Sequence, residues 1–261
     1  MRPRLLVSTT SHKAEPLLPA LEVFARLDLR DLDLNLHHVM ELNVDVEAIR
    51  RAVDASGLRV WALSGGWCDF FHGPPRIEDT FRSVDRQVAV AGQFGVDLLR
   101  LFFGRLPLAD YSAASLSAVC GNLQRTSDRH PDVRFVFENH DGVSLDPQIC
   151  RDILTQVDRP NIRMNFDPIN FERHGVNSLQ ALDVVRPLVG HMHLKGLQNS
   201  EFCEFGVGDV DLTPHLRTLL TTGYTGSFSV EYEGPFDKTL RLYQSVGRAR
   251  TVLASLTAPT G

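Results

Sequence analysis

Four side chains in the second half of the chain have the types and positions expected of a site for a divalent metal ion. Each stands at or just after the end of a short apolar run: Glu138, Asp167, His193 and Glu231. Because successive side chains of a strand point to opposite faces, each lies on the polar face of its own run. Four neighbouring strands would therefore bring three carboxylates and one imidazole to one place.

This set of donors predicts metal-assisted proton transfer. Three carboxylates and one imidazole favour Mn²⁺, Mg²⁺ or Co²⁺ over the thiolate-rich sites that hold structural zinc, with zinc as an alternative. A bound ion would polarise a substrate carbonyl. Glu138 and Glu231 would face each other across the site, where they could serve as base and acid on one carbon.

Further polar residues share the inward faces of these runs. His140 and Lys195 are candidates for binding substrate oxygens, and ion pairing at the rim is the alternative. Glu233, two residues beyond Glu231, is an alternative metal ligand. A cavity role and ordinary polar packing are equally open for four residues of the first half: Asp33, Asn35, His37 and Arg100. For the aromatic loop 67–72 the alternatives are an apolar wall over the substrate and anchoring of the loop in the core.

The elements that must position these residues alternate along the chain. Strand-like runs are expected at 4–10, 32–38, 58–64, 98–104, 133–139, 162–167, 190–195 and 227–233. Segments of helical period are expected at 15–27, 45–57, 77–95, 111–127, 146–157, 178–189, 213–223 and 237–256. Eight such pairs predict an α/β fold, a single (βα)8 TIM barrel.

A doubly wound open sheet would show the same alternation. However, no GxGxxG motif follows the first run. In an open sheet, strands buried between two layers of helices are apolar on both faces. In these runs, by contrast, one face carries polar residues toward the C-terminal end of the run. A barrel accommodates that polar face, because the active sites of barrels lie at the carboxyl ends of their strands.

Several junctions carry the chemistry of helix ends. Asp146-Pro147 and Thr213-Pro214 predict an N-cap followed by proline at the first helical position, and Asp45 is a further predicted N-cap. Gly57 and Gly95 follow helical segments, as C-terminal caps do. Since no linker or charge block divides the chain, residues 1–261 are expected to form a single domain.

Composition limits the partners. The 261 residues carry a formal net charge of -5 and contain no long Lys/Arg run. We therefore expect a small-molecule substrate and no nucleic-acid partner. An apolar run of only three residues near the N-terminus predicts neither signal peptide nor membrane span, hence a cytoplasmic protein. The four cysteines form no CxxC pair and predict reduced thiols. Either a monomer or a homo-oligomer is compatible with this sequence.

Five short motifs, in this order, resemble the xylose isomerase-like TIM-barrel family of sugar phosphate isomerases and epimerases. They are ENH, NFDPIN, GHMHLKG, GVGDVDL and SVEYEG. The resemblance implies the same four metal ligands and the same proton-transfer pair, and it makes His193 rather than His191 the ligand. Asn170 stands where many relatives have a substrate-binding histidine, which makes it a candidate for binding substrate. Gly196 replaces the acidic residue of the family's HLKD motif.

The resemblance leaves several functions open. The first is a metal-dependent isomerase or epimerase acting on a keto sugar, polyol or related hydroxy-carbonyl compound. The second is a lyase or dehydratase acting on a keto-cyclitol, dehydroshikimate-like or keto-glycoside substrate, because the same base would remove the same kind of proton. A phosphodiesterase like endonuclease IV and a non-catalytic binding subunit are the remaining alternatives; the first of these would need several metal ions and a basic groove.

Overall fold

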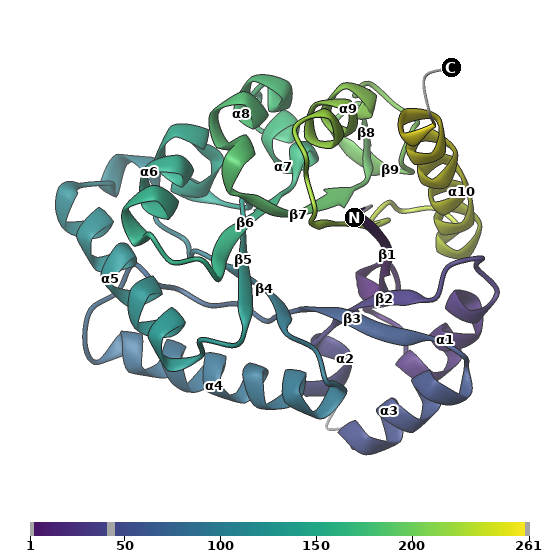
Figure 1. The fold of residues 1–261 in the computed structure, drawn as a ribbon, viewed down its shortest axis with the longest axis horizontal. Helices are drawn as coiled ribbons and strands as arrows, with labels where there is room; N and C mark the ends of the chain where they lie inside the picture. The colour runs from purple at the N-terminus through teal and green to yellow at the C-terminus, as the bar shows by residue number, and fades with distance from the viewer. Residues whose placement is uncertain (1–2, 41–44, 259–261) are drawn as a thin grey trace.

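The described part of the chain is built around a closed barrel of parallel strands (Figure 1). The computed structural model describes residues 3–40 and 45–258, so the ends of the predicted domain lie outside it. The barrel strands are β1 (Arg4–Ser8), β2 (Asp31–Asn35), β3 (Arg59–Ser64), β4 (Leu98–Phe102), β5 (Arg134–Glu138), β6 (Ile162–Phe166), β7 (Val189–Leu194) and β10 (Ser227–Val230). β10 closes the ring by pairing with both β1 and β7. The predicted (βα)8 barrel is confirmed.

Helices lie outside this ring of strands (Figure 1). The longer ones are α1 (Leu17–Ala25), α3 (Val46–Ala55), α4 (Arg76–Phe94), α5 (Ala113–Arg129), α6 (Pro147–Val157), α8 (Ser178–Val185), α9 (Thr213–Thr221) and α10 (Lys238–Thr257). The outward face of each strand is apolar and packs against them, as Phe135 and Phe137 of β5 do with no exposed surface. In residues 3–40 and 45–258, no helix is long and apolar enough to cross a membrane.

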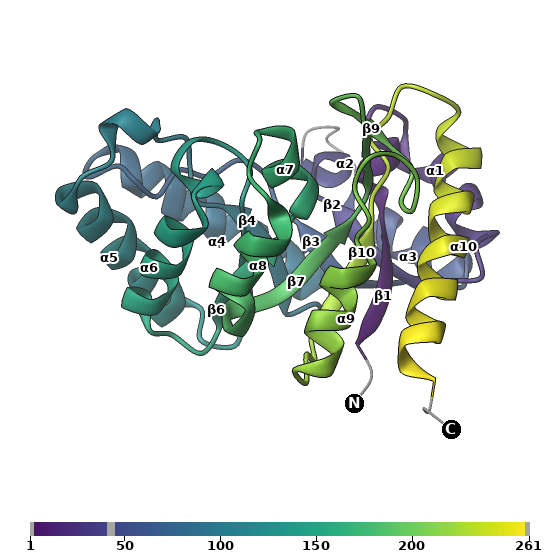
Figure 2. The ribbon, with the colours of Figure 1, turned by 90° about the horizontal axis from the view of Figure 1, so that it is seen from above.

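Short elements extend the ends of the strands. They are α2 (His37–Met40), α7 (Pro168–Arg173), a hairpin of β8 (Gly196–Gln198) and β9 (Glu201–Cys203), and 3-10 turns η1 (Thr9–His12), η2 (Leu108–Asp110), η3 (Gly142–Leu145) and η4 (Arg186–Leu188). Figure 2 shows α2, α7 and β9 at one end of the barrel. The strand expected through residue 38 ends at Asn35, because the Asn35 side chain accepts from the His37 N–H (2.9 Å) and α2 begins there.

The predicted helix caps are confirmed except at α9, and the helical segment expected to reach residue 189 ends at Val185, where η4 follows. Asp146 accepts from the Gln148 and Ile149 N–H groups, and Asp45 caps α3. The prediction of Thr213 as an N-cap is wrong. The α9 helix begins at Thr213 itself, and the carboxylate of Asp211 accepts the Thr213 N–H at 2.8 Å. A carboxylate two residues earlier thus satisfies the free donor of the first turn.

The barrel interior is layered. A small apolar cluster fills the part of the interior nearer the amino ends of the strands: Leu6, Ala62, Leu98 and Val136. Two residues further along the same four strands stand Ser8, Ser64, Arg100 and Glu138, all buried. Because a strand repeats its orientation every two residues, the interior changes from apolar to polar within one step along the barrel axis. The polar layer lies toward the carboxyl ends of the strands.

Candidate metal centre

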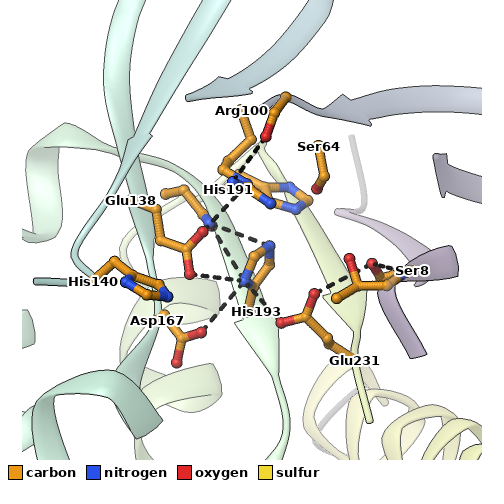
Figure 3. A network of polar contacts seen from close by, with 12 residues as sticks. Ser8, Ser64, Arg100, Glu138, His140, Asp167, His191, His193 and Glu231 are labelled. Atoms are coloured by element: carbon orange, nitrogen blue, oxygen red, sulfur yellow. Dashed lines mark hydrogen bonds and ion pairs between the residues drawn. The ribbon is translucent and has the colours of Figure 1, made fainter. Parts of the chain in front are cut away.

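The four predicted ligands converge at the carboxyl ends of β5, β6, β7 and β10 (Figure 3). His193 Nδ1 lies 3.3 Å from Asp167 Oδ2, 3.5 Å from Glu231 Oε2 and 3.6 Å from Glu138 Oε1. All four side chains are buried. Ligand atoms of Glu138, Asp167 and His193 lie within 4.8 Å of one another. Three carboxylates therefore surround one imidazole nitrogen, as the strand parity predicted.

Asp167 is oriented by the backbone around it. Its Oδ1 accepts the N–H groups of Ile169 (3.0 Å) and Asn170 (3.1 Å) as the N-cap of α7, which leaves Oδ2 turned toward His193. Asn139 ties the same residue to β5, because its side chain bonds both the N–H and the C=O of Asp167, each at 2.8 Å. One carboxylate oxygen is thus committed to the cap of α7, and the other faces His193 and the site.

Two buried cations compensate the carboxylates. Lys195 Nζ lies 2.9 Å from Asp167 Oδ2 and 3.1 Å from Glu231 Oε2. Arg100 Nε lies 3.2 Å from Glu138 Oε2. Because burying an uncompensated charge is very costly, these pairs account for how a group of acids can be buried together.

The same contacts set the protonation states. Burial alone would raise the pKa of Glu138, but Arg100 and His193 outweigh it and hold that pKa well below its usual value. Burial likewise opposes ionisation of Glu231, yet His193 and Lys195 lower its pKa. The pKa of Lys195 is raised well above its usual value because the surrounding carboxylates outweigh burial. Both glutamates are therefore ionised near neutral pH, as a ligand or a base must be.

This donor set fits a divalent cation. Glu138, Asp167 and His193 offer hard oxygen and nitrogen donors within 4.8 Å of one another. Glu231 adds a third carboxylate, whose Oε2 lies 3.5 Å from His193 Nδ1, and such a set suits Mg²⁺, Mn²⁺ or Zn²⁺. The residues that would hold the ion are Glu138, Asp167, His193 and Glu231. The alternative ligand Glu233 instead pairs with Lys195 (2.8 Å) and Lys13 (3.3 Å) nearer the surface.

A second polar group lies deeper. Asp33 accepts hydrogen bonds from Ser64 (2.8 Å) and Ser229 (3.1 Å), and its Oδ2 is 3.9 Å from Nε2 of both His191 and His193. Burial raises the pKa of Asp33. His191 Nδ1 lies 2.7 Å from Ser227 Oγ, which matches the packed, hydrogen-bonded role expected for it. Asp33 thus supports the far side of the His193 ring.

A cavity of about 200 Å³ opens above the site. His140 and Lys195 line it, together with Asn35, His37 and Arg100. Trp67 stacks on Phe102 with ring centroids 4.7 Å apart, and His140 packs edge-on against both rings. Of the aromatic loop, Trp67 therefore lines the cavity, whereas Phe70 and Phe71 are buried in the core. The cavity lies beside the acidic centre, which consists of Glu138, Asp167, His193 and Glu231.

Asn170, predicted to bind substrate, makes protein contacts. Its Nδ2 donates to Glu138 Oε1 (3.0 Å) and to the Asn139 carbonyl (2.9 Å). It therefore holds one of the two glutamates in place. The second glutamate has a comparable support that the sequence reasoning missed, since Ser8 Oγ donates to Glu231 Oε1 at 3.3 Å. The only sequence signal for Ser8 was a polar residue ending the apolar run of β1.

The comparison with protein families agrees with the fold. The family described as "Xylose isomerase-like TIM barrel" matches residues 20–250. The chain belongs to this family. One curated relative is a 3-dehydroshikimate dehydratase of Bacillus anthracis, 20% identical over 48% of this chain and 46% of its own. Another, from Xenopus laevis and provisionally named a hydroxypyruvate isomerase, is 23% identical over 61% of this chain and 62% of its own. The chain thus spans about half to three fifths of these relatives.

Solved structures of the same fold include family members with bound metal. The probable 3-DHS dehydratase of petrobactin synthesis from Bacillus anthracis superposes with a TM-score of 0.80 at 14% identity, over 95% of this chain and 98% of its own. A xylose isomerase-like barrel from Mycobacterium smegmatis was solved with magnesium (TM-score 0.77, 16% identity, 99% and 98% covered). The IOLI protein was solved with zinc (TM-score 0.78, 16% identity, 97% of both chains covered).

Proposed function

We propose that this protein is a divalent-metal-dependent isomerase or epimerase acting on a keto sugar, polyol or related hydroxy-carbonyl compound. The observation that carries the proposal is the pair of ionised glutamates, Glu138 and Glu231, on either side of His193 Nδ1 at 3.6 and 3.5 Å. A divalent ion bound by the four ligands would polarise the substrate carbonyl and acidify the neighbouring C–H. One glutamate then accepts that proton, and a proton returns to carbon from the same or the opposite carboxylate.

The surrounding residues match these roles. Asn170 and Arg100 hold Glu138, while Ser8 and Lys195 hold Glu231, so each carboxylate keeps a defined direction. Lys195 and His140 line the cavity and are placed to bind substrate oxygens. The stacked Trp67 and Phe102 offer an apolar face for the carbon skeleton and exclude water from one side of the cavity.

A dehydratase is the second candidate, and the name of the Bacillus anthracis relative favours it. The same carboxylate would remove the same proton, and a hydroxyl on the adjacent carbon would leave. The isomerase name of the Xenopus laevis relative supports the first candidate. The two reactions differ in the fate of the carbon skeleton, so NMR of the products separates them.

The test is exchange of substrate hydrogen in D₂O. The protein saturated with Mn²⁺ is incubated with ketoses, hydroxypyruvate and 3-dehydroshikimate, and deuterium at carbon is followed by NMR. We expect Glu138→Gln and Glu231→Gln to lower the exchange rate by about 10²-fold or more, the usual range for loss of a general base. Exchange at the native rate in both variants, with metal still bound, would contradict the mechanism.

A further inference from the structure

A second cavity opens at the opposite end of the barrel, where the strands begin. Its volume is about 490 Å³, more than twice that of the cavity above the acidic centre. Its walls come from the first residues of β4 to β7, from η4 and from the turn between α9 and β10. Leu98 and Val136 of the apolar layer line it. This layer separates it from the acidic centre. Pockets of this size suit small organic ligands.

The charges around this cavity have one sign. Three arginines line it, Arg134, Arg163 and Arg186, and within residues 3–40 and 45–258 no acidic side chain does. Arg134 is neutralised by a bidentate pair with Asp97 (2.6 and 2.9 Å). Among the described residues, the ion pair of Arg186 is a distant one, 3.9 Å from Asp183. The cavity therefore carries an excess of positive charge.

Arg163 carries most of that excess. Nearby arginines at this end of the barrel have carboxylate partners, as Arg59 and Arg4 share Asp31. In the described part of the chain, Arg163 has no hydrogen bond or ion pair of its own. Its position on β6 shares the inward parity of Asp167 at the other end of the same strand. The Arg163 side chain lines the cavity and is exposed to solvent, so its forked donors are accessible to a ligand that enters.

Two glycines shape the site. A Cβ on Gly190 would lie 2.8 Å from Arg163 Cβ and 3.3 Å from Val136, so the absence of a side chain there gives the arginine stem its place. A Cβ on Gly226 would lie 2.3 Å from the Gly190 carbonyl. The close approach of β7 and β10 at their first residues thus depends on both glycines, and the cavity floor is a feature of the barrel itself.

We infer that this lower cavity, lined by Arg134, Arg163 and Arg186, binds a small organic anion: a carboxylate or phosphate monoester on an apolar ring. The forked guanidinium of Arg163 matches the two oxygens of either anion. The apolar walls from Leu98, Phe135 and Leu219 match the ring. The strands β5, β6 and β7 join this cavity to Glu138, Asp167 and His193, so it offers a binding site remote from the acidic centre.

The probes are 1-naphthyl phosphate, 1-naphthoate and uncharged 1-naphthol, titrated into the Mg²⁺-saturated protein by calorimetry. The two anions distinguish phosphate from carboxylate preference. We expect at least one anion to bind about tenfold more tightly than 1-naphthol. Arg163→Gln should weaken binding about tenfold or more, which corresponds to about 1.4 kcal/mol or more, because a charge-assisted hydrogen bond is lost. The matched control is Arg151→Gln, which removes one charge from an exposed helix position.

The location is read from amide NMR shifts. We expect the amide shifts of Gly190, Gly223 and Gly226 to change, and those of Gly65 and Gly66, which line the cavity above the acidic centre, to stay the same. Arg186→Gln, at another lining residue of the same cavity, provides a second variant should Arg163→Gln fold poorly, and should weaken binding severalfold. Shifts confined to Gly65 and Gly66, equal binding of 1-naphthol, or equal effects of Arg163→Gln and Arg151→Gln would each overturn the inference.

Discussion

Arg100 Nε lies 3.2 Å from Glu138 Oε2, and both side chains are buried in the barrel interior, 7% and 4% exposed. The two residues are on neighbouring strands, where Arg100 is level with Val136, one interior layer below Glu138. The guanidinium also donates to the Gly65 carbonyl (3.3 Å) and lies over the Phe102 ring. A fixed cation thus sits beneath the carboxylate proposed as a catalytic base.

Replacing Arg100 by methionine should destabilise the metal-free protein by about 3 kcal/mol, because breaking a buried ion pair leaves an uncompensated charge. The free energy of unfolding is measured with urea in the presence of a chelator. Glu138→Gln added to Arg100→Met should restore part of that loss, since the uncompensated charge is then gone. Strictly additive losses in the double variant would show that the two side chains do not depend on each other.

His193→Ala should lower Mn²⁺ affinity by about 100-fold or more, because loss of an outer-shell partner alone costs about 10–100-fold. His140→Ala is the control, since its ring contacts Trp67, Phe102 and the carboxylate of Asp141 rather than the four proposed ligands. That variant should bind Mn²⁺ within about twofold of the native protein. Calorimetry with Mn²⁺ decides, and an equal loss in both variants would refute the assignment of His193.

Lys195→Met should change metal affinity in the opposite direction. Lys195 Nζ lies 2.9 Å from Asp167 Oδ2, so its charge repels a cation at that oxygen. Removing it should tighten Mn²⁺ binding about tenfold and lower the melting temperature of the metal-free protein. Lys13→Met, at a half-exposed side chain paired with Glu233, should have a much smaller effect. Weaker Mn²⁺ binding by Lys195→Met would refute the repulsion argument.

Restoring the family's acidic residue at position 196 should harm this protein. A Cβ on Gly196 would lie 2.4 Å from the Glu204 carbonyl and 2.9 Å from the Val207 carbonyl. Gly196→Ala and Gly196→Asp should each cost about 2 kcal/mol or more, because backbone atoms must move. Gly92→Ala in α4, where a Cβ meets nothing within 4 Å, should be neutral or stabilising. Urea unfolding compares them, and a native-like Gly196→Asp would contradict the packing.

Acid should destabilise the fold partly through His215. Burial lowers the pKa of this imidazole, whose Nε2 lies 2.8 Å from Ser178 Oγ and whose Nδ1 has no partner within the described residues. Below the ordinary value of 6.5 the unfolded chain binds the proton that the folded one refuses, so stability is lost as pH falls.

His215→Gln keeps a donor toward Ser178 but cannot titrate. We therefore expect its free energy of unfolding to fall less steeply than that of the native protein between about pH 7 and pH 5. Urea unfolding at several pH values measures both slopes. Equal slopes would show that His215 is protonated as readily in the folded state as in the unfolded one.

Strand parity and helix chemistry were readable from the sequence because they are local. Alternation along β5 placed Glu138 on the inward face, and Asp146-Pro147 predicted the start of α6. The same reasoning found all four residues of the acidic centre, since matching strand ends meet in a closed parallel sheet. It missed α7 and the β8–β9 hairpin, whose short segments carry little periodicity of their own.

Only the tertiary structure decided which groups touch. Ser8 reaches Glu231 across 223 positions of sequence, and Asn170 turns toward Glu138 rather than into the cavity. Among residues 3–40 and 45–258, Arg163 has no partner while Arg134 has Asp97, although the two follow the same strand pattern. Such contacts depend on how the strands stagger when the sheet closes, and that stagger is set by all eight strands together. A local pattern can therefore tell which way a side chain faces, but not what it meets.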